Sequence, residues 1–335
     1  MSDLVLVTGA SGFVAGHVIQ ELLGRGYRVR GTVRSVARAA AVADVLAGAQ
    51  LVEADLGSDA GWAEAVEGCR YVVHTASPFP AAEPKHEDEL VRPAVDGTLR
   101  VLRAAAAAGV ERVVVTSSIA AVEVGNEGHT LTEADWSDTA RCDAYQKSKT
   151  LAERAAWDFV AEHPELELAV INPGMIIGPV LRAEAGTSVG GIRTVLAGDM
   201  PGVPRLNFAT VDVRDLAVAH RLAMEVPAAA GNRYICAGPE TTFPAMAEIL
   251  AQRYRVSTRV LPDWLVRLVA RFNPDARLAA RFLGRHENLS AAKAEKELGW
   301  TMRPLADSLY DTAASLIDTG LVADPGSPRS ARAAA

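Results

Sequence analysis

The chain has 335 residues, of which 49% are hydrophobic, a length that accommodates one large domain or a large domain with a smaller appendage. Its 41 Asp and Glu residues outnumber its 34 Lys and Arg residues, which gives a formal charge of −7 and leaves no basic tract of the kind that binds nucleic acid. Three widely spaced cysteines, the lack of a secretory leader and the lack of a bilayer-spanning apolar run lead us to expect a cytoplasmic protein with unpaired thiols and no membrane partner.

The first half of the chain alternates between short β-branched apolar runs and alanine-rich helical stretches. This alternation is typical of βαβ units, so we predict an α/β fold with a doubly wound parallel sheet of six strands, the Rossmann arrangement. A ligand of such a sheet is expected at the carboxyl ends of the strands. The predicted strands are Leu4–Thr8, Arg28–Val33, Gln50–Ala54, Tyr71–His74, Arg112–Ser117 and Leu168–Asn172, and helices are predicted to begin near Gly12, Val36, Asp59, Glu87 and Asp143.

Beyond Pro173 the alternation ends, and glycines and prolines cluster up to residue 204. We therefore predict a dinucleotide-binding domain over residues 1–173 and a smaller C-terminal, mainly substrate-binding lobe over residues 174–324, with elements at about 205–237 returning to the sheet. The tail at 325–335 is rich in small residues and is expected to be disordered. The elements predicted in this half are helices at Asp212–Val226, Phe243–Tyr254, Trp264–Phe272 and Ala291–Leu298 and a short strand at Arg233–Cys236.

A glycine-containing turn follows the first predicted strand. Gly9 and Gly12 let the backbone turn sharply and approach a pyrophosphate, which the N–H groups at the start of the next helix would hold. The signal is weak alone, because a glycine pair also serves a tight connection between a strand and a helix.

Tyr145 and Lys149 lie four residues apart in a predicted helix and so project from the same face. An adjacent ammonium favours the phenolate, so we expect Lys149 to lower the pKa of Tyr145 and make it a better acid–base catalyst. Ser118 follows the fifth predicted strand at the carboxyl edge of the sheet. There it would donate a hydrogen bond to a substrate carbonyl while Tyr145 protonates the oxygen.

The chain resembles the extended short-chain dehydrogenase/reductases. The resemblance rests on the order of the glycine turn, the serine at the strand end and the Tyr/Lys helix, and it covers nearly the whole chain. The family loop usually reads TGxxGxxG, whereas Ala15 here stands at the last glycine position, a replacement small enough for helix–strand packing. The resemblance implies that Ser118, Tyr145 and Lys149 are catalytic. Within the superfamily the chain is most similar to the NADPH-dependent group of dihydroflavonol reductase, cinnamoyl-CoA reductase and microbial carbonyl (methylglyoxal) reductases, through the stretches Gly31–Ser35, His74–Phe79, Pro93–Thr98, Ala144–Glu153, Asn172-Pro173 and Gly178-Pro179.

The second predicted strand ends in Arg34 and lacks the acidic residue that binds the ribose 2′-hydroxyl in NAD-preferring relatives. Arg34, with Arg38 one helical turn later, can instead pair with a 2′-phosphate, so NADPH/NADP+ is the predicted cofactor. No grouping of His, Cys, Asp and Glu indicates a metal. The predicted cofactor-binding residues are Thr8, Gly9, Ser11, Gly12, Phe13, Val14, Arg34, Arg38, Asp55, Leu56, Thr75, Ala76, Ser77, Thr116, Lys149, Pro173, Gly174 and Met175.

The predicted function is NADPH-dependent reduction of an aldehyde or ketone to an alcohol, that is, a carbonyl reductase or alcohol dehydrogenase. Its partner would be a small-molecule carbonyl substrate, apolar or aromatic. Whether two copies of the chain form a homodimer is left open. Alternatives are a sugar-nucleotide epimerase or dehydratase, a hydroxysteroid-type dehydrogenase and a non-catalytic NADP(H)-binding regulator. Thr116 precedes two serines rather than the Asp-Glu pair of family dehydratases, which counts against dehydration. Candidate substrate-lining residues are Phe79, Met175, Ile176 and Phe208.

Overall fold

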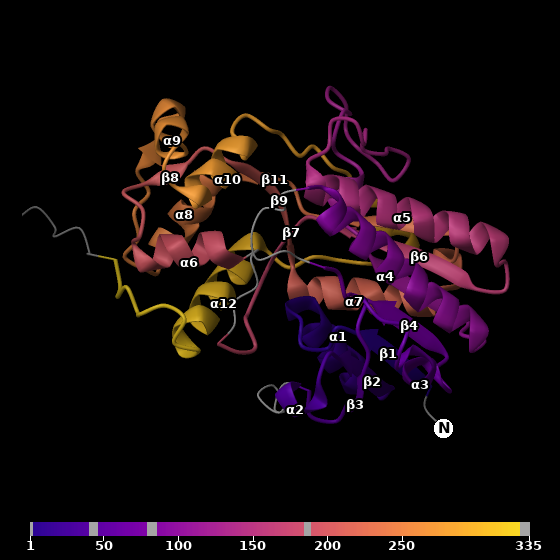
Figure 1. Cartoon of the computed structure of the whole chain (residues 1–335). Helices are drawn as coiled ribbons and strands as arrows, with labels where there is room; N and C mark the ends of the chain where they lie inside the picture. The colour runs from indigo at the N-terminus through magenta and orange to yellow at the C-terminus, as the bar shows by residue number, and fades with distance from the viewer. Residues whose placement is uncertain (1–2, 40–45, 79–85, 184–188, 329–335) are drawn as a thin grey trace, which may run out of the picture. The chain divides into compact units, whose positions relative to one another are not determined.

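The computed structural model describes residues 3–39, 46–78, 86–183 and 189–328, without the side chains of residues 38, 39, 274, 275 and 278. Two compact units make up the chain (Figure 1). The first unit consists of Met1–Gly174, Arg214–Cys236 and Ser290–Thr301, and the second of Met175–Val213, Ala237–Leu289 and Met302–Ala335. Of the predicted tail, residues 329–335 lie outside the described residues, and the carbonyl of Gly326 accepts a hydrogen bond from the backbone of Arg255.

The first unit is built on a seven-stranded sheet of order β10-β6-β5-β4-β1-β2-β3, in which every neighbouring pair is parallel. The predicted doubly wound sheet is confirmed, but the prediction of six strands is wrong by one, because β10 pairs with β6. The strands are β1 (Leu4–Thr8), β2 (Arg28–Val33), β3 (Gln50–Glu53), β4 (Tyr71–His74), β5 (Arg112–Thr116), β6 (Glu167–Pro173) and β10 (Asn232–Cys236).

Helices cover both faces of this sheet. Alternate strand residues such as Leu6, Val72 and Val113 form one core cluster with α3, α4 and α5, as expected where side chains alternate between the two faces. An ion pair of 2.7 Å between Arg221 and Glu21 joins α7 to α1, which packs on β1 and β2. The helices are α1 (Phe13–Gly24), α2 (Val36–Ala39), α3 (Trp62–Val66), α4 (Asp88–Ala107), α5 (Ala144–Glu162), α7 (Val213–Glu225) and α11 (Ala292–Leu298), with short 3-10 turns η2 (Ile119–Ala121) and η4 (Pro227–Ala229).

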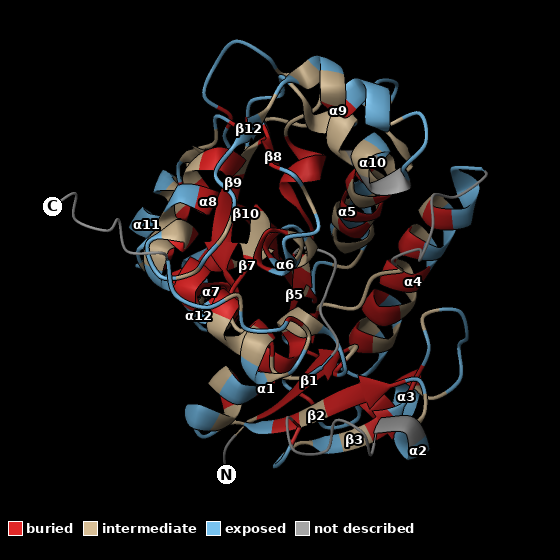
Figure 2. Cartoon of the chain, turned by 90° about the vertical axis from the view of Figure 1, so that its left-hand side faces the viewer, coloured by how far each residue is buried: buried red, intermediate tan, exposed pale blue. Residues whose placement is uncertain are grey.

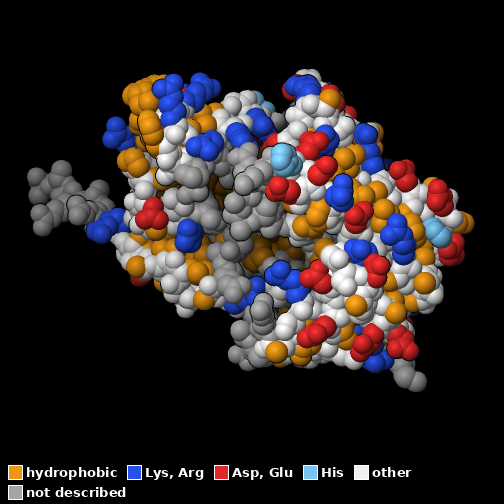
Figure 3. Space-filling view, viewed as in Figure 1, with side chains coloured by type: hydrophobic (Ala, Val, Ile, Leu, Met, Phe, Trp, Pro, Cys, Tyr) orange, Lys and Arg blue, Asp and Glu red, His pale blue; other side chains and the backbone are white. Residues whose placement is uncertain are grey.

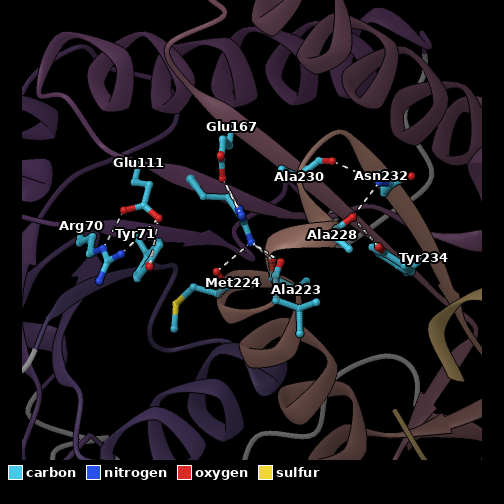
Figure 4. A network of polar contacts seen from close by, with 12 residues as sticks. Arg70, Tyr71, Glu111, Glu167, Ala223, Met224, Ala228, Ala230, Asn232 and Tyr234 are labelled. Atoms are coloured by element: carbon cyan, nitrogen blue, oxygen red, sulfur yellow. Dashed lines mark hydrogen bonds and ion pairs between the residues drawn. The ribbon is translucent and has the colours of Figure 1, made fainter. Parts of the chain in front are cut away.

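Arg112 on β5 ties the sheet to the end of α7 (Figure 4). Its side chain is only 4% exposed, and its Nη1 donates to the carbonyls of Ala223, Met224 and Val226 at 2.7–3.0 Å, while Glu167 pairs with its other nitrogens. The carbonyls of Ala223 and Met224 belong to the last turn of α7, where no intrahelical N–H is left to bond them, and Val226 directly follows the helix. The guanidinium therefore satisfies buried acceptors and holds α7 in place.

The second unit contains a three-stranded sheet, β7 (Met175–Ile177), β9 (Asn207–Asp212) and β11 (Glu240–Thr242), and a two-stranded one, β8 (Val203–Pro204) with β12 (Val260–Leu261). The buried faces of its elements form a core of their own, drawn in red in Figure 2. The three cysteines of the chain are free thiols, as predicted. The helices of this unit are α6 (Gly190–Ala197), α8 (Phe243–Ala251), α9 (Asp263–Val269), α10 (Pro274–Phe282) and α12 (Leu305–Asp318).

Candidate active site

The glycine turn between β1 and α1 leaves a backbone cradle. Gly9 has a φ of 66°, and a Cβ on it would come within 3.0 Å of the Cβ of Ala76. Gly12 is exposed, its N–H closes the turn onto the carbonyl of Gly9 at 2.7 Å, and as the N-cap of α1 it provides no side-chain cap. The first turn of α1 contains no acidic side chain, so its N–H groups suit an anion. Ala15 is 1% exposed, which explains why a small residue is needed there.

Hydrogen bonds from Thr8 brace this cradle against β4. The Thr8 hydroxyl accepts a bond from the N–H of Ala76 at 3.0 Å, so its own proton points to Nδ1 of His74 at 2.8 Å. Thr75 in turn donates its hydroxyl to the Thr8 carbonyl at 2.6 Å. Burial, and then the charge of Lys149, lower the pKa of His74 to about 3, so the imidazole is neutral and acts as an acceptor. Hydrogen bonds thus join Thr8, at the end of β1, to Thr75 and Ala76, which follow β4, so the carboxyl ends of these two neighbouring strands are held together.

Ser118 and Tyr145 are brought together at the end of β5. Ser118 is the N-cap of η2, where its Oγ accepts the N–H of Ala120 at 3.1 Å. The Ser118 hydroxyl also shares a hydrogen bond with the phenol of Tyr145. Tyr145 stands in the first turn of α5, which begins with a capping box between Asp143 and Gln146, so the helix start that carries it is fixed.

The electrostatics of this pair differ from the sequence prediction. Burial raises the pKa of Tyr145 above its ordinary value, and the hydrogen bond with Ser118 opposes that rise only in part. The expected lowering of the pKa of Tyr145 is therefore wrong for the protein alone, because burial is the largest effect and raises it, and Lys149 is not among the groups that shift this pKa. Burial also lowers the pKa of Lys149 to about 8, against the opposing charge of Glu153. At neutral pH Tyr145 is a phenol, and Lys149 is an ammonium.

Thr116, predicted to contact the cofactor, bonds a histidine that the sequence analysis did not identify. Nδ1 of His220 lies 2.8 Å from the carbonyl of Leu216 and donates to it, so Nε2 is the acceptor for the Thr116 hydroxyl at 2.7 Å. Burial lowers the pKa of His220 to about 4, which keeps it neutral. The two residues are 104 positions apart, and no local pattern in one sequence reveals such a contact.

The remaining cofactor residues fall into three groups. Ser11 and Arg34 are exposed, and the side chain of Arg38 lies outside the described part of the chain. Asp55 accepts the N–H of Gly57 at 2.7 Å and so caps a turn. The others lie along the carboxyl edge of the sheet or at the start of α1, namely Phe13, Val14, Leu56, Ser77, Pro173 and Gly174.

Three of the predicted substrate-lining residues belong to the second unit. Met175 and Ile176 on β7 pair with Thr210 and Val211 on β9, the strand that also carries Phe208. The Phe208 ring lies 6.2 Å from that of Phe243 and 6.1 Å from that of Phe282. Phe79 lies outside the described residues.

Neither a metal-binding cluster nor a membrane-spanning helix is found among the described residues. No group of three or more His, Cys, Asp and Glu side chains there could hold a metal ion. Across the same ranges, every helix is too short or too polar to cross a bilayer. On the face drawn in Figure 3, basic and acidic side chains are mixed over the right-hand part, whereas basic side chains predominate at the upper left.

Comparison with known proteins identifies the family of the chain. The model of the NAD dependent epimerase/dehydratase family matches residues 5–237. Cinnamoyl-CoA reductase 1 of Arabidopsis thaliana is 34% identical over 331 residues, covering 95% of this chain and 90% of that protein, and dihydroflavonol 4-reductase of Zea mays is 32% identical over 330 residues, covering 92% and 87%. The NADPH complex of yeast methylglyoxal/isovaleraldehyde reductase Gre2 matches with a TM-score of 0.77 and 28% identity, covering 95% and 99%. The chain therefore belongs to the NAD dependent epimerase/dehydratase family and is an NAD(P)-dependent oxidoreductase of the extended short-chain dehydrogenase/reductase type.

Proposed function

We propose that the protein reduces the carbonyl group of a small apolar aldehyde or ketone to an alcohol, with NADPH as the reductant. The observation that carries this proposal is the hydrogen bond between Ser118 and Tyr145, on the unit that also bears Lys149 and the glycine cradle. A Cβ on Gly9 would crowd Ala76, and a Cβ on Gly12 would crowd the carbonyl of Gly9, so glycine at both positions keeps the turn tight. The N–H groups at the start of α1 would then hold the pyrophosphate.

Each polar group has a distinct task in this mechanism. Bound NADPH supplies the hydride to the carbonyl carbon. Ser118 donates a hydrogen bond to the carbonyl oxygen, and Tyr145, kept as a phenol by burial, gives its proton to the same oxygen as negative charge develops there. The ammonium of Lys149 stabilises the phenolate that remains on Tyr145 and bonds the ribose hydroxyls of the cofactor. Solvent then returns a proton to Tyr145.

The cofactor preference is part of the proposal. Arg34 is exposed directly after β2, where its planar fork would pair with a 2′-phosphate. The acidic residue that would favour NAD at this position is missing from the sequence.

Reduction of an acyl-CoA thioester is a second candidate, favoured by the 34% identity to a cinnamoyl-CoA reductase. Dehydration is disfavoured, because Ser117 stands where family dehydratases place an acidic residue and its hydroxyl is bonded to Glu153 at 2.5 Å. An NADPH oxidation assay with matched panels of aldehydes, ketones and acyl-CoA thioesters separates the two reductions. A sugar nucleotide is tested by product analysis, because epimerisation and dehydration consume no NADPH overall. Turnover of only the thioesters or the sugar nucleotide would overturn the proposal.

Tyr145→Phe tests the mechanism. We expect NADPH to bind with unchanged affinity while kcat falls at least about a hundredfold, the usual contribution of a proton donor. Tyr254→Phe, which also removes one phenol hydroxyl, is the matched control and should keep full activity. Retention of most activity in Tyr145→Phe would refute the assigned role.

A further inference from the structure

The stretch Ala144–Glu153 ends in a buried carboxylate to which the proposed mechanism gives no task. Glu153, on α5 one turn after Lys149, is 1% exposed. Its Oε2 accepts the hydroxyl of Ser117 at 2.5 Å and the amide of Asn172 at 2.8 Å, and its Oε1 accepts Nε of Arg233 at 2.5 Å. The residue directly after β5, a residue of β6 and a residue of β10 thus deliver one donor each to a single side chain. A fourth donor, Nε1 of Trp157 on the same helix, lies 3.4 Å from Oε1 of Glu153.

These donors connect directly to Ser118. Ser117 is its neighbour in the chain, and the same amide nitrogen of Asn172 that bonds Glu153 lies 3.1 Å from the carbonyl of Ser118. Asn172 is fully buried, so its amide has no solvent to turn toward. The backbone that carries the Ser118 hydroxyl is therefore fixed through Asn172 to the carboxylate of Glu153.

Arg233 is the counter-ion that makes a buried carboxylate tolerable. It is 7% exposed, donates from Nη1 to the carbonyls of Glu133 and Asp135 at 2.9 Å, and lies over the ring of Trp136 at 3.7 Å. A paired arrangement of this kind is required because an isolated buried charge would be very unfavourable. The pair also fixes the segment before α5 to the sheet.

We propose that Glu153 is a positioning residue for the reaction, which holds the backbone of Ser118 through Asn172 and supplies the negative charge beside Lys149. The proposal deepens the proposed function and rests on it for its catalytic consequence. The effect of Glu153 on Lys149 does not depend on any substrate, because the carboxylate raises the pKa of Lys149 while burial lowers it. Lys149 also acts on His74 of β4, which is neutral, and Tyr145 lies one turn before it on α5. The guanidinium of Arg233 faces the same carboxylate from β10 at 2.5 Å.

The direct test is the titration of Lys149 in the cofactor-free protein. Lysine occurs only at positions 85, 147, 149, 293 and 296, so protein labelled with 13C at the lysine ε-carbon gives few signals, and Lys149→Arg identifies the relevant one. We expect a midpoint near pH 8 in the parent protein and a midpoint lower by about one pH unit or more in Glu153→Gln. Glu162→Gln, at an exposed position of the same helix, should leave the midpoint unchanged. An unchanged midpoint in Glu153→Gln would overturn the electrostatic role.

A double variant separates electrostatics from folding. Glu153→Gln alone leaves Arg233 buried without its counter-ion and should lower the melting temperature. Glu153→Gln with Arg233→Met removes both charges, so it should recover melting temperature while the Lys149 midpoint stays low. A double variant with the parent midpoint would show that Glu153 acts on Lys149 only through the fold.

Kinetics then test the positioning role. In the double variant we expect kcat to fall about tenfold through misplacement of Ser118, with the basic limb of the pH profile moved to lower pH and NADPH affinity unchanged. Parent kcat and an unmoved limb would overturn the role in catalysis. If no carbonyl compound is reduced by the parent protein, the proposed function fails, and the titration still decides whether Glu153 controls Lys149.

Discussion

Replacing Gly9 by alanine tests the phosphate cradle with a cost that follows from the structure. The residue has a φ of 66°, a region that costs an L-amino acid about 1–2 kcal/mol. The new Cβ would also lie 3.0 Å from the Cβ of Ala76, so the β4 end of the cradle must shift. We expect the free energy of unfolding to fall by about 2 kcal/mol and the affinity for NADPH to fall at least tenfold, which is about 1.4 kcal/mol.

Gly109→Ala is the matched control for this substitution. Gly109 has a φ of 68°, and a Cβ there would meet nothing within 4 Å, so only the backbone cost applies. Urea unfolding measures the stability of both variants, and fluorescence titration measures NADPH binding. Gly109→Ala should lose about 1–2 kcal/mol of stability and bind NADPH like the parent. Equal NADPH affinities in the two variants would refute the assignment of the cradle.

Three further outcomes are expected. Arg34→Ala should raise the KM for NADPH much more than the KM for NADH in steady-state assays, and equal changes would contradict the 2′-phosphate assignment. Burial lowers the pKa of His220 to about 4 in the folded protein, whereas in the unfolded chain the imidazole binds a proton below about pH 6.5. The free energy of unfolding should therefore fall by up to about 3 kcal/mol as the pH drops from 6.5 to 4. Urea unfolding of His220→Leu should show a shallower acid slope there, and an unchanged slope would exclude this histidine as the cause. Arg112→Met should lower the free energy of unfolding by about 3 kcal/mol, whereas the exposed Arg141→Met should cost under about 1 kcal/mol, and similar losses would contradict the role of the buried guanidinium.

The sheet could be predicted, and the candidate catalytic residues proposed, because their signals are local. β1, β2 and β4 have the predicted bounds. β1 and β4 are mainly apolar runs, rich in β-branched residues and buried along their whole length, and β2 is buried toward its carboxyl end. Tyr145 and Lys149 share a helix face at a spacing that depends on helix geometry alone.

Elements of the second unit were harder to predict. Strands such as β7, with three residues, are too short for periodicity to identify. Two helices absent from the prediction have readable signals. Asn273 caps the start of α10 through the N–H of Ala276, and α12 repeats apolar residues at helical spacing after Pro304.

The pKa of Tyr145 could not be predicted from its helix. Four-residue spacing places an ammonium near the phenol, but the extent of burial depends on how η2 and the end of β5 pack around it. The bonds between Glu153 and Arg233 and between Thr116 and His220 likewise join residues 80 and 104 positions apart. Such contacts exist only once the strands are assembled in order.

The N-cap position of Ser118 affects how any substitution there is interpreted. Its Oγ already accepts the N–H of Ala120, so the hydroxyl is oriented during folding and little rotational freedom remains to be lost when substrate binds. Ser118→Ala would remove a turn-closing acceptor together with the donor, so its rate deficit is an upper bound on what the hydroxyl contributes to catalysis. Ser118→Thr retains both functions, so it should keep most of the rate and confirm that the deficit of Ser118→Ala comes from loss of the hydroxyl.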